Sequence, residues 1–510
     1  MKTDGSGLSE LAAIPLNDRD GPLYRQVYRG LRQAILEGRL AAHSKLPASR
    51  SLAKHLGVGR NTVTIAYDQL AAEGYIAART GAGSFVAETL PDPVPGEKGT
   101  ERKASTSRPA LKLSERGKAL LRLGGARRQA PVARPFAAGQ PDPDAFPFPV
   151  WSRLLARVWR RPAAELIHND DPMGYAPLRH AIAAFLRASR ALDCDAGQVM
   201  VVSGAQQALD LICRVVLDPG DRVWVEDPGF PGVDGALGAV GGEIVPVSID
   251  GSGLDVAYGN RRAPDARAVL CTPSRNYPLG TTMSLQRRLE LLRWAEDNDA
   301  WIVEDDYDSE FRYDGRPLTS LQGLDRAGRV IYVGTFSRIL FPAARLGYVV
   351  APPDLMPALV AVRTYMDGHT TLITQAALAA FFDDGHFSSH LRRMRSLYRA
   401  RRDCLLEALA RECPSASVIS AAESGTHLVI APPWAGTDYG QDTGKDHGQD
   451  VDMSATLEDA GLTCPPLSRY FRESPGRAGL ILGFARFGED DIRSGIRRLA
   501  EKMGAVPKVV

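Results

Sequence analysis

Residues 46–86 read LPASRSLAKHLGVGRNTVTIAYDQLAAEGYIAARTGAGSFV, and this stretch decides the fold of the first part of the chain. It contains two short helical patterns separated at Gly57. The first places Leu52 and Leu56 on one face. The second runs over about residues 60–73 and would bury Val63, Ala66, Tyr67 and Leu70. Apolar residues three and four apart are typical of helices that pack against a core. The stretch therefore predicts two packed helices joined by a tight turn.

The flanking residues predict a third helix and a hairpin. Residues 22–38 carry apolar side chains four apart, at Leu23, Val27, Leu31 and Ile35. After Gly74, alternating residues predict a strand, a turn at residues 80–83 and a returning strand through Phe85. Three helices followed by a hairpin indicate a winged helix-turn-helix. In that fold the start of the third helix faces base edges and phosphates.

Charge is unevenly distributed along the chain. Residues 1–134 carry 22 Lys and Arg against 12 Asp and Glu, a net charge of +10. The whole chain carries only +2, so residues 135–510 must carry −8. An excess of positive charge suits the first part to a polyanion such as nucleic acid. A solvated basic face would give the same balance, so the motifs must decide between them.

Residues 46–86 resemble the DNA-binding domain of the GntR superfamily of regulators along their whole length. The resemblance implies that residues 16–89 form a domain that binds double-stranded DNA, preceded by a flexible terminus over residues 1–15. It assigns phosphate or guanine contacts to Arg50 and Arg60, and a wing tip in the minor groove to residues 81–84. The residues that it places at the DNA are Arg50, Arg60, Asn61, Thr62, Thr64, Gly81, Gly83 and Ser84.

The composition of residues 90–134 predicts a linker. Early prolines, polar residues and excess positive charge favour an extended, solvated chain, with a short helix around residues 115–123. It is either a passive spacer or a tether that also touches DNA electrostatically. From residue 135, apolar strand-like runs alternate with helical segments, which predicts an α/β domain with a mainly parallel sheet. Polar residues follow the strands, at the edge where ligands bind in such sheets.

These polar strand ends resemble a known effector domain. The motifs are DPMGYAPLRHAI, EDPGF, TPSRN, EDDYD, TFSR and LSRYF. Together they resemble the MocR/PdxR branch of the GntR regulators, in which a winged helix-turn-helix is fused to a fold-type I aminotransferase-like domain. The resemblance implies that residues 135–510 form a homodimer and bind pyridoxal 5′-phosphate (PLP). Residues 436–452, rich in Gly and Asp, are the exception and are expected to form a mobile surface insertion.

The resemblance also assigns the cofactor contacts. Residues 203–206 open a helix after a strand, an arrangement that suits a phosphate. Asp305 would pair with the pyridine nitrogen, Tyr307 would meet the phenolic oxygen, and Phe230 would stack on the ring. The complete set is Ser203, Gly204, Ala205, Gln206, Phe230, Asn276, Asp305, Tyr307, Thr335, Ser337, Arg338 and Arg345.

Arg338 departs from the family pattern, which reads TFSK where this chain reads TFSR. Arginine stays protonated near neutral pH and cannot be the nucleophilic amine that forms an internal aldimine. No lysine lies between Lys118 and Lys445 that could replace it. Arg275-Asn276 and Asn169 also depart from the pattern. Ile481 stands about where the aminotransferases carry the arginine that binds the substrate carboxylate.

Three interpretations of the pocket stay open: PLP held without a covalent bond, another small anionic effector, or an unliganded scaffold for dimerisation. Since Arg275 and Arg338 add positive charge, we expect the pocket to favour an anion. For the whole chain, a catalytically inactive regulator competes with a PLP-dependent aminotransferase that carries a DNA-binding domain. Six dilute cysteines predict neither disulfides nor zinc, and nothing suggests a metal site. Without an export signal or a membrane-length apolar run, a cytoplasmic location is expected.

Overall fold

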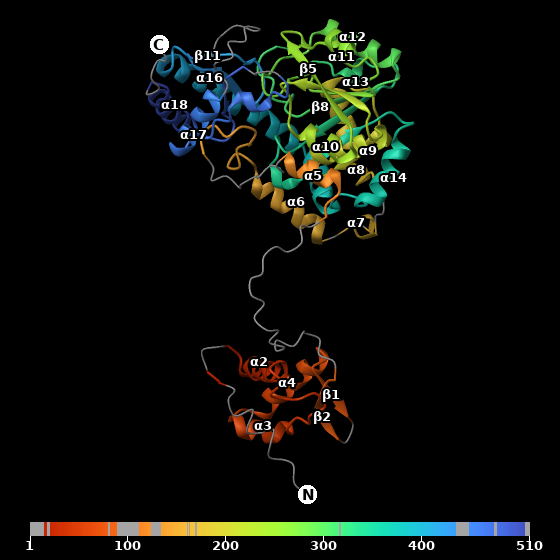
Figure 1. Ribbon diagram of the computed structural model, residues 1–510, viewed down its shortest axis with the longest axis vertical. Helices are drawn as coiled ribbons and strands as arrows, with labels where there is room; N and C mark the ends of the chain where they lie inside the picture. The colour runs from red at the N-terminus through yellow and green to blue at the C-terminus, as the bar shows by residue number, and fades with distance from the viewer. Residues whose placement is uncertain are drawn as a thin grey trace. The chain divides into compact units, whose positions relative to one another are not determined.

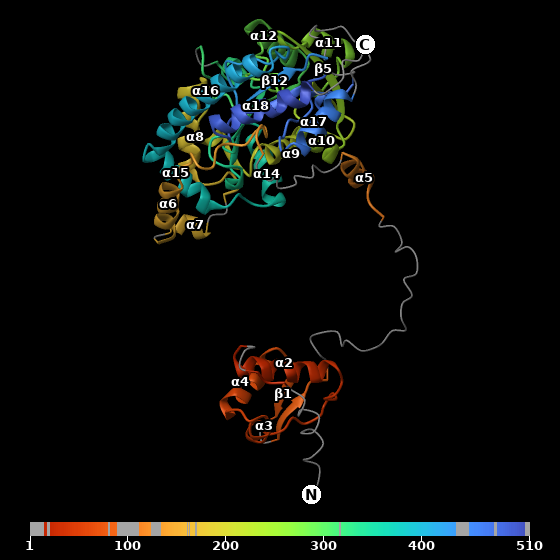
Figure 2. The same ribbon diagram turned by 90° about the vertical axis from the view of Figure 1, so that its left-hand side faces the viewer.

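The computed structural model divides the chain into two compact units, Met1–Lys112 and Leu113–Val510. The described residues are 15–17, 21–79, 82–88, 112–123, 134–160, 162, 164–168, 171–315, 318–434, 448–473 and 477–504. Figures 1 and 2 show each unit from two sides.

The first unit is the predicted winged helix-turn-helix. Its helices are α2 (Leu23–Leu36), α3 (Ser49–Leu56) and α4 (Arg60–Ala72). Strands β1 (Ile76–Arg79) and β2 (Gly83–Val86) pair antiparallel, with Ile76 opposite Val86. Gly57 ends α3 in the left-handed conformation, at φ +66°, which glycine adopts at little cost. The apolar stripes of the three helices meet in one core, which includes Val27, Leu31, Leu52, Val63 and Leu70.

The second unit is built on an eight-stranded sheet. In sheet order the strands are β3 (Val199–Val202), β10 (Gly347–Val350), β9 (Val330–Thr335), β8 (Trp301–Asp306), β7 (Ala268–Cys271), β4 (Arg222–Asp227), β5 (Glu243–Asp250) and β6 (Gly253–Leu254). The pairs from β9 through β5 are parallel. By contrast, β10 runs antiparallel to both β3 and β9. The predicted mainly parallel sheet is therefore confirmed.

Helices cover both faces of this sheet, so the strands are apolar in their interiors, and the charged residues of β4 and β8 stand at the strand ends. In β3, Met200 and Val202 join one core with α9, whereas Val199 and Val201 join a second core with α8. The helices of this layered part are α6 (Phe148–Arg160), α7 (Ala164–His168), α8 (Ala176–Arg190), α9 (Ala205–Val216), α10 (Gly232–Val240), α11 (Val256–Arg262), α12 (Leu285–Asp297), α13 (Leu321–Leu324), α14 (Met356–Met366) and α15 (Leu372–Asp383).

A smaller α/β layer completes the second unit. Its antiparallel sheet has the order β11 (Ser417–Val418), β12 (His427–Ala431) and β13 (Leu480–Gly483). Three helices accompany it: α16 (His386–Glu412), α17 (Gln449–Asp459) and α18 (Glu489–Gly504). Figure 1 shows these three helices, in blue, on one side of the second unit. Short 3₁₀ turns are found at Ala196–Gln198, Pro342–Ala344 and Leu467–Tyr470.

The structure changes two predicted boundaries. The expected short helix is present as α5 (Glu115–Arg122), and Leu120 and Leu123 pack against Gly238 of α10. The end of the predicted linker therefore belongs to the second unit, because Leu120 and Leu123 contact α10 of that unit. Of the predicted insertion, residues 436–447 lie outside the described residues. Its last residues belong to α17, in which Asp450 is fully buried, so 452 is too late a boundary.

Candidate DNA-binding surface and ligand site

The start of α4 presents polar side chains to solvent, as the sequence predicts. Arg60 and Asn61 are exposed, and Thr62 and Thr64 are half-buried. Thr64 Oγ1 donates to the carbonyl of Arg60 at 3.1 Å, so its hydroxyl is already engaged within the helix. Arg50 lies in the first turn of α3 and is also exposed. Within the described part of the chain, neither guanidinium of Arg50 and Arg60 has an ion-pair or hydrogen-bond partner.

The hairpin adds a second basic element. Gly83 has φ +106°, and Ser84 beside it is half-buried; Gly81 lies outside the described residues. Lys45, which sequence reasoning missed, forms a β-bridge with Phe85. Its Cε lies 3.1 Å from where a Cβ on Gly83 would stand. In the sequence, the only sign that residue 45 could add to the basic surface was that a lysine stands directly before the LPASR motif.

Strand order brings the predicted phosphate-binding segments together. Gly347, at the start of β10, pairs with Val202 at the end of β3 and with Thr335 at the end of β9. The residues that follow β3 and β9 therefore meet the residues that precede β10 at one edge. This edge carries Ser203, Gly204, Thr335, Ser337 and Arg345.

Two glycines, Gly204 and Gly347, lie close together at the start of α9, beside the Arg345 guanidinium. Gly204, the N-cap of α9, has φ +96°, and Arg345 lies beside it with its guanidinium 3.7 Å from where a Cβ would stand. A Cβ on Gly347 would lie 2.9 Å from the Gly204 Cα, so the close approach of β10 requires glycine. Arg345 is exposed and has no ion-pair partner among the described residues. A free cation beside backbone N–H groups of a helix start suits a phosphate.

Residues from a distant segment complete this edge. Ser203 Oγ lies 3.1 Å from Thr370 Oγ1, and the Ser203 N–H donates to Gln207. Buried Arg363 of α14 donates to both Thr370 and Gln207. Gln206 donates to the carbonyl of Gly232, and Thr335 Oγ1 accepts from the Ser337 N–H. Sequence reasoning missed Thr370 and Arg363, since neither stands in a strand-end motif.

Asp305 and Tyr307 lie at the end of β8 with unpaired polar atoms. Asp305 is 9 % exposed, and its Oδ1 has no hydrogen-bond partner in the described residues. Burial raises the pKa of Asp305 to about 7, and Asp306 and Glu226 act in the same direction while Arg338 opposes them. The Tyr307 hydroxyl is also buried without a described partner. Buried unpaired groups of this kind are costly unless a ligand satisfies them.

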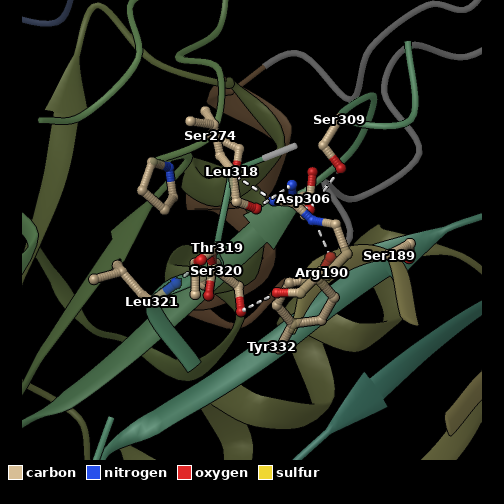
Figure 3. Close-up of polar contacts among 12 residues, drawn as sticks. Ser189, Arg190, Ser274, Asp306, Ser309, Leu318, Thr319, Ser320, Leu321 and Tyr332 are labelled. Carbon is tan, nitrogen blue, oxygen red and sulfur yellow. Dashed lines mark hydrogen bonds and ion pairs between the residues drawn. The ribbon is translucent and has the colours of Figure 1, made fainter. Parts of the chain in front are cut away.

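The next carboxylate along the strand, that of Asp306, is paired, in contrast to that of Asp305. Asp306 forms a buried ion pair with Arg190 of α8 at 2.7 Å and accepts from the hydroxyls of Tyr332 and Ser309. Figure 3 shows these groups together with Ser274, which also accepts from Arg190. Because successive strand residues point to opposite faces, Asp306 fastens β8 to the structure while Asp305 stays available.

The EDPGF loop forms one side of a recess that Asp305 also lines. Glu226 accepts from Thr272 Oγ1 at 2.5 Å and from Asn276 Nδ2 at 3.1 Å, and burial raises its pKa. Phe230 lines the same recess, with its ring 6.1 Å from that of Tyr277. Tyr277 in turn contacts the rings of Tyr307, His427 and Tyr470. The sequence motifs alone did not reveal this aromatic cluster.

Arg472 ties the smaller layer to the same loop. Its guanidinium donates to the carbonyls of Glu226 and Phe230 and to Asp234 of α10. It follows LSRYF directly, but the motif itself gave no sign of these contacts.

Arg338 lies where TFSR leaves β9. Its guanidinium carbon is 5.8 Å from the centre of the Tyr307 ring. A Cβ on Gly139, whose φ is +76°, would overlap Arg338 Nη1, so the arginine fits only because residue 139 has no side chain. Nη1 is buried and has no hydrogen-bond partner in the described ranges.

Arg275 does not add charge to the site, contrary to the sequence-based expectation. It is 2 % exposed, lies 3.6 Å from Asp308, and donates to the carbonyls of Ala421 and His427. Gly280 and Gly425 leave the space that its guanidinium fills. Its charge is used to join the two layers of the unit. Ile481 is fully buried in β13, and Arg486 beyond that strand donates to Gln140. Asn169 lies outside the described residues.

Comparisons with known proteins agree with this architecture. Residues 23–86 match "Bacterial regulatory proteins, gntR family", and residues 136–454 match "Aminotransferase class I and II". The "Probable rhizopine catabolism regulatory protein MocR" of Rhizobium meliloti is 39% identical over 96% of this chain and 97% of its own length. The pyridoxine biosynthesis regulator PdxR of Corynebacterium glutamicum is 33% identical over 92% of this chain and 93% of its own. A kynurenine aminotransferase structure from Pyrococcus horikoshii superposes with a TM-score of 0.65, 28% identity and coverage of 78% and 95%.

A winged helix fused to a fold-type I aminotransferase domain defines the class of the protein. The chain belongs to the MocR/PdxR-type regulators of the GntR family. It is therefore a transcription regulator with a DNA-binding domain and an aminotransferase-like domain. None of the helices in the described ranges is long and apolar enough to cross a membrane.

Proposed function

We propose that the protein is a dimeric transcription regulator that reads two operator half-sites and senses a small anionic ligand, with PLP held without a covalent bond as the leading candidate. One observation carries the proposal. A site with unpaired groups for a charged ring and a phosphate has arginine at residue 338, and no lysine lies between Lys118 and Lys445.

The residues present fit PLP. Residues 203–206 with Arg345 would hold its phosphate beside Thr335 and Ser337, and Asp305 would pair with its ring nitrogen. Tyr307 would donate to its phenolic oxygen, Phe230 would cover the ring, and Asn276 fixes the loop beside it through Glu226. The unpaired Asp305 Oδ1 and Tyr307 hydroxyl support this assignment. When bound, PLP supplies an aldehyde and an electron-withdrawing pyridine ring.

Arg338 argues against transaminase activity. Its guanidinium stays protonated, so it neither attacks an aldehyde nor takes a proton from a substrate carbon. The competing function, an aminotransferase with an attached DNA-binding domain, draws support from the "Aromatic-amino-acid aminotransferase 1" of Thermococcus litoralis, which is 30% identical over 79% of this chain. We expect no transamination by the purified protein and no cofactor fixed to it by borohydride.

The DNA-binding assignment is tested with a gel shift on the natural promoter fragment over a salt series. Arg60→Ala should weaken binding by about 1–3 kcal/mol if Arg60 reads guanine, and should lower the salt slope if it binds phosphate. Arg29→Ala removes the same charge from the exposed face of α2 and serves as the control. Equal affinity of wild type and Arg60→Ala at every salt concentration would refute the role of Arg60.

A further inference from the structure

Arg338 is a cation in the site that forms no ion pair with any described residue. Among the described residues, no carboxylate lies within 4.0 Å of its guanidinium. Its neighbours are the backbone of Gly139 and the face of the Tyr307 ring, and its Nη1 is buried without a partner. A buried guanidinium N–H that donates to nothing carries a free-energy cost, which an acceptor on a ligand would remove.

The nearby acidic groups do not fill this role. Asp308 is fully buried 3.6 Å from Arg275, and Arg275 and Arg338 together oppose the rise in its pKa that burial causes. Asp306 is held by Arg190, Tyr332 and Ser309. Glu226 accepts from Thr272 and Asn276. Asp305 has an unpaired Oδ1, and Arg338 opposes the rise in its pKa, but the proposed function uses this carboxylate for the ring nitrogen of the ligand.

The site thus has two separate cations without partners. Arg345 lies over Gly204 at the phosphate edge, and Arg338 lies over Tyr307. In a pyridoxal ligand the carbon that bears the variable substituent stands between the ring carbon with the phenolic oxygen and the ring carbon with the phosphate arm. If those two groups were held at Tyr307 and Gly204, the substituent would face the region of Arg338, whose guanidinium lies over the Tyr307 ring.

We propose that Arg338 makes the site select the acid form of the ligand, a phosphorylated pyridine whose variable substituent is a carboxylate. The inference rests on the proposed function and names the ligand class more closely. A lysine could bond covalently only to the aldehyde form, by forming an imine with loss of water. Arginine instead binds a carboxylate through two parallel hydrogen bonds and repels an ammonium group. The aldehyde form would bind second, and the aminomethyl form least tightly.

The test uses the full-length protein and calorimetric titration with three ligands that differ only in this substituent: pyridoxic acid 5′-phosphate, PLP and pyridoxamine 5′-phosphate. The wild type should bind the acid at least tenfold more tightly than the amine. Arg338→Gln should remove this ranking and lower the affinity for the acid about tenfold or more. Arg345→Gln is the matched control and should weaken all three by a similar factor, since it faces the phosphate they share.

Arg338→Lys is a second variant that keeps the proposal testable if Arg338→Gln does not fold. It keeps the positive charge and should acquire PLP that borohydride fixes to residue 338, identified by peptide mass mapping. Equal binding of the three ligands by the wild type, or tightest binding of the amine, overturns the selectivity and leaves the ligand site of the proposed function intact. Binding of none, with inorganic phosphate as a further probe, overturns both.

Discussion

Gly139 and Arg338 depend on each other at the scale of single residues. Gly139→Ala places a methyl group on the guanidinium and strains a backbone with φ +76°. We expect a loss of about 2–4 kcal/mol in the free energy of unfolding, measured by denaturant titration. In an Arg338→Ala background the overlap disappears and only the backbone strain of about 1 kcal/mol should be left. Additive effects of the two substitutions would contradict the contact.

Asp305 should make stability depend on pH. Its pKa is raised from 3.8 to about 7, chiefly by burial. The folded state therefore holds a proton that the unfolded state loses, and this contribution is complete below pH 3.8 and is lost as the pH rises through about 7. Asp305→Asn removes that dependence. Relative to the ligand-free wild type, the variant should gain stability between pH 4 and 8, by at most a few kcal/mol.

Thermal unfolding at several pH values checks this prediction. Asp195→Asn, at an exposed position that caps a 3₁₀ turn, provides a control without the same burial. A wild type and Asp305→Asn pair with a constant difference in stability from pH 4 to 8 would contradict the raised pKa of Asp305.

At the scale of elements, α5 is held to α10 by two leucines. Leu120 and Leu123 approach Gly238 of α10. This helix begins at Gly232, whose carbonyl accepts a hydrogen bond from Gln206 at the start of α9. Leu120→Asp should release α5, because it places a charge against an apolar surface. Hydrogen exchange should then speed up in α5 and stay unchanged in the strands of the large sheet. Lys118→Asp, on an exposed part of α5, is the control.

The elements were largely predictable, whereas several of the side chains that complete the site were not. Apolar periodicity was enough for α2, α4 and the buried strands, because burial on one or two faces imposes it directly. The motifs at strand ends predicted Ser203 and Asp305 at one sheet edge, and the family resemblance added Arg345. Thr370, Arg363 and Arg472 were missed, since they reach the site from segments without a strand-end pattern. The sequence also could not predict the role of Arg275, because that role depends on contacts with Asp308 and with the carbonyls of Ala421 and His427, and residue spacing does not reveal those contacts.

At the scale of the whole molecule, we predict a homodimer formed by the second unit. Trp159 of α6 is 65 % exposed and Tyr365 of α14 is 92 % exposed, so large apolar side chains lie on its surface. Tyr365 is two residues from Arg363, whose guanidinium donates to Gln207 near the start of α9. Light scattering of the full chain should give a dimer at micromolar concentration. Trp159→Glu with Tyr365→Glu should shift it toward monomer.

The matched control for this experiment is Leu285→Glu at the start of α12, which is 61 % exposed. Figures 1 and 2 show α12 at the end of the second unit opposite to α6. This variant should stay dimeric. A wild-type monomer, or dissociation by Leu285→Glu alone, would refute the predicted interface.

The pairing of β10 between β3 and β9 has a consequence for synthesis on the ribosome. The sheet edge that carries Ser203, Thr335 and Arg345 closes only when Gly347 meets Val202, and these two residues leave the ribosome far apart in time. The winged helix has its own core from residues within the first unit, and it folds from contacts local in sequence. A nascent chain therefore presents a folded winged helix before the large sheet of the second unit is complete. Chains truncated during translation would keep a folded winged helix without the aminotransferase-like domain.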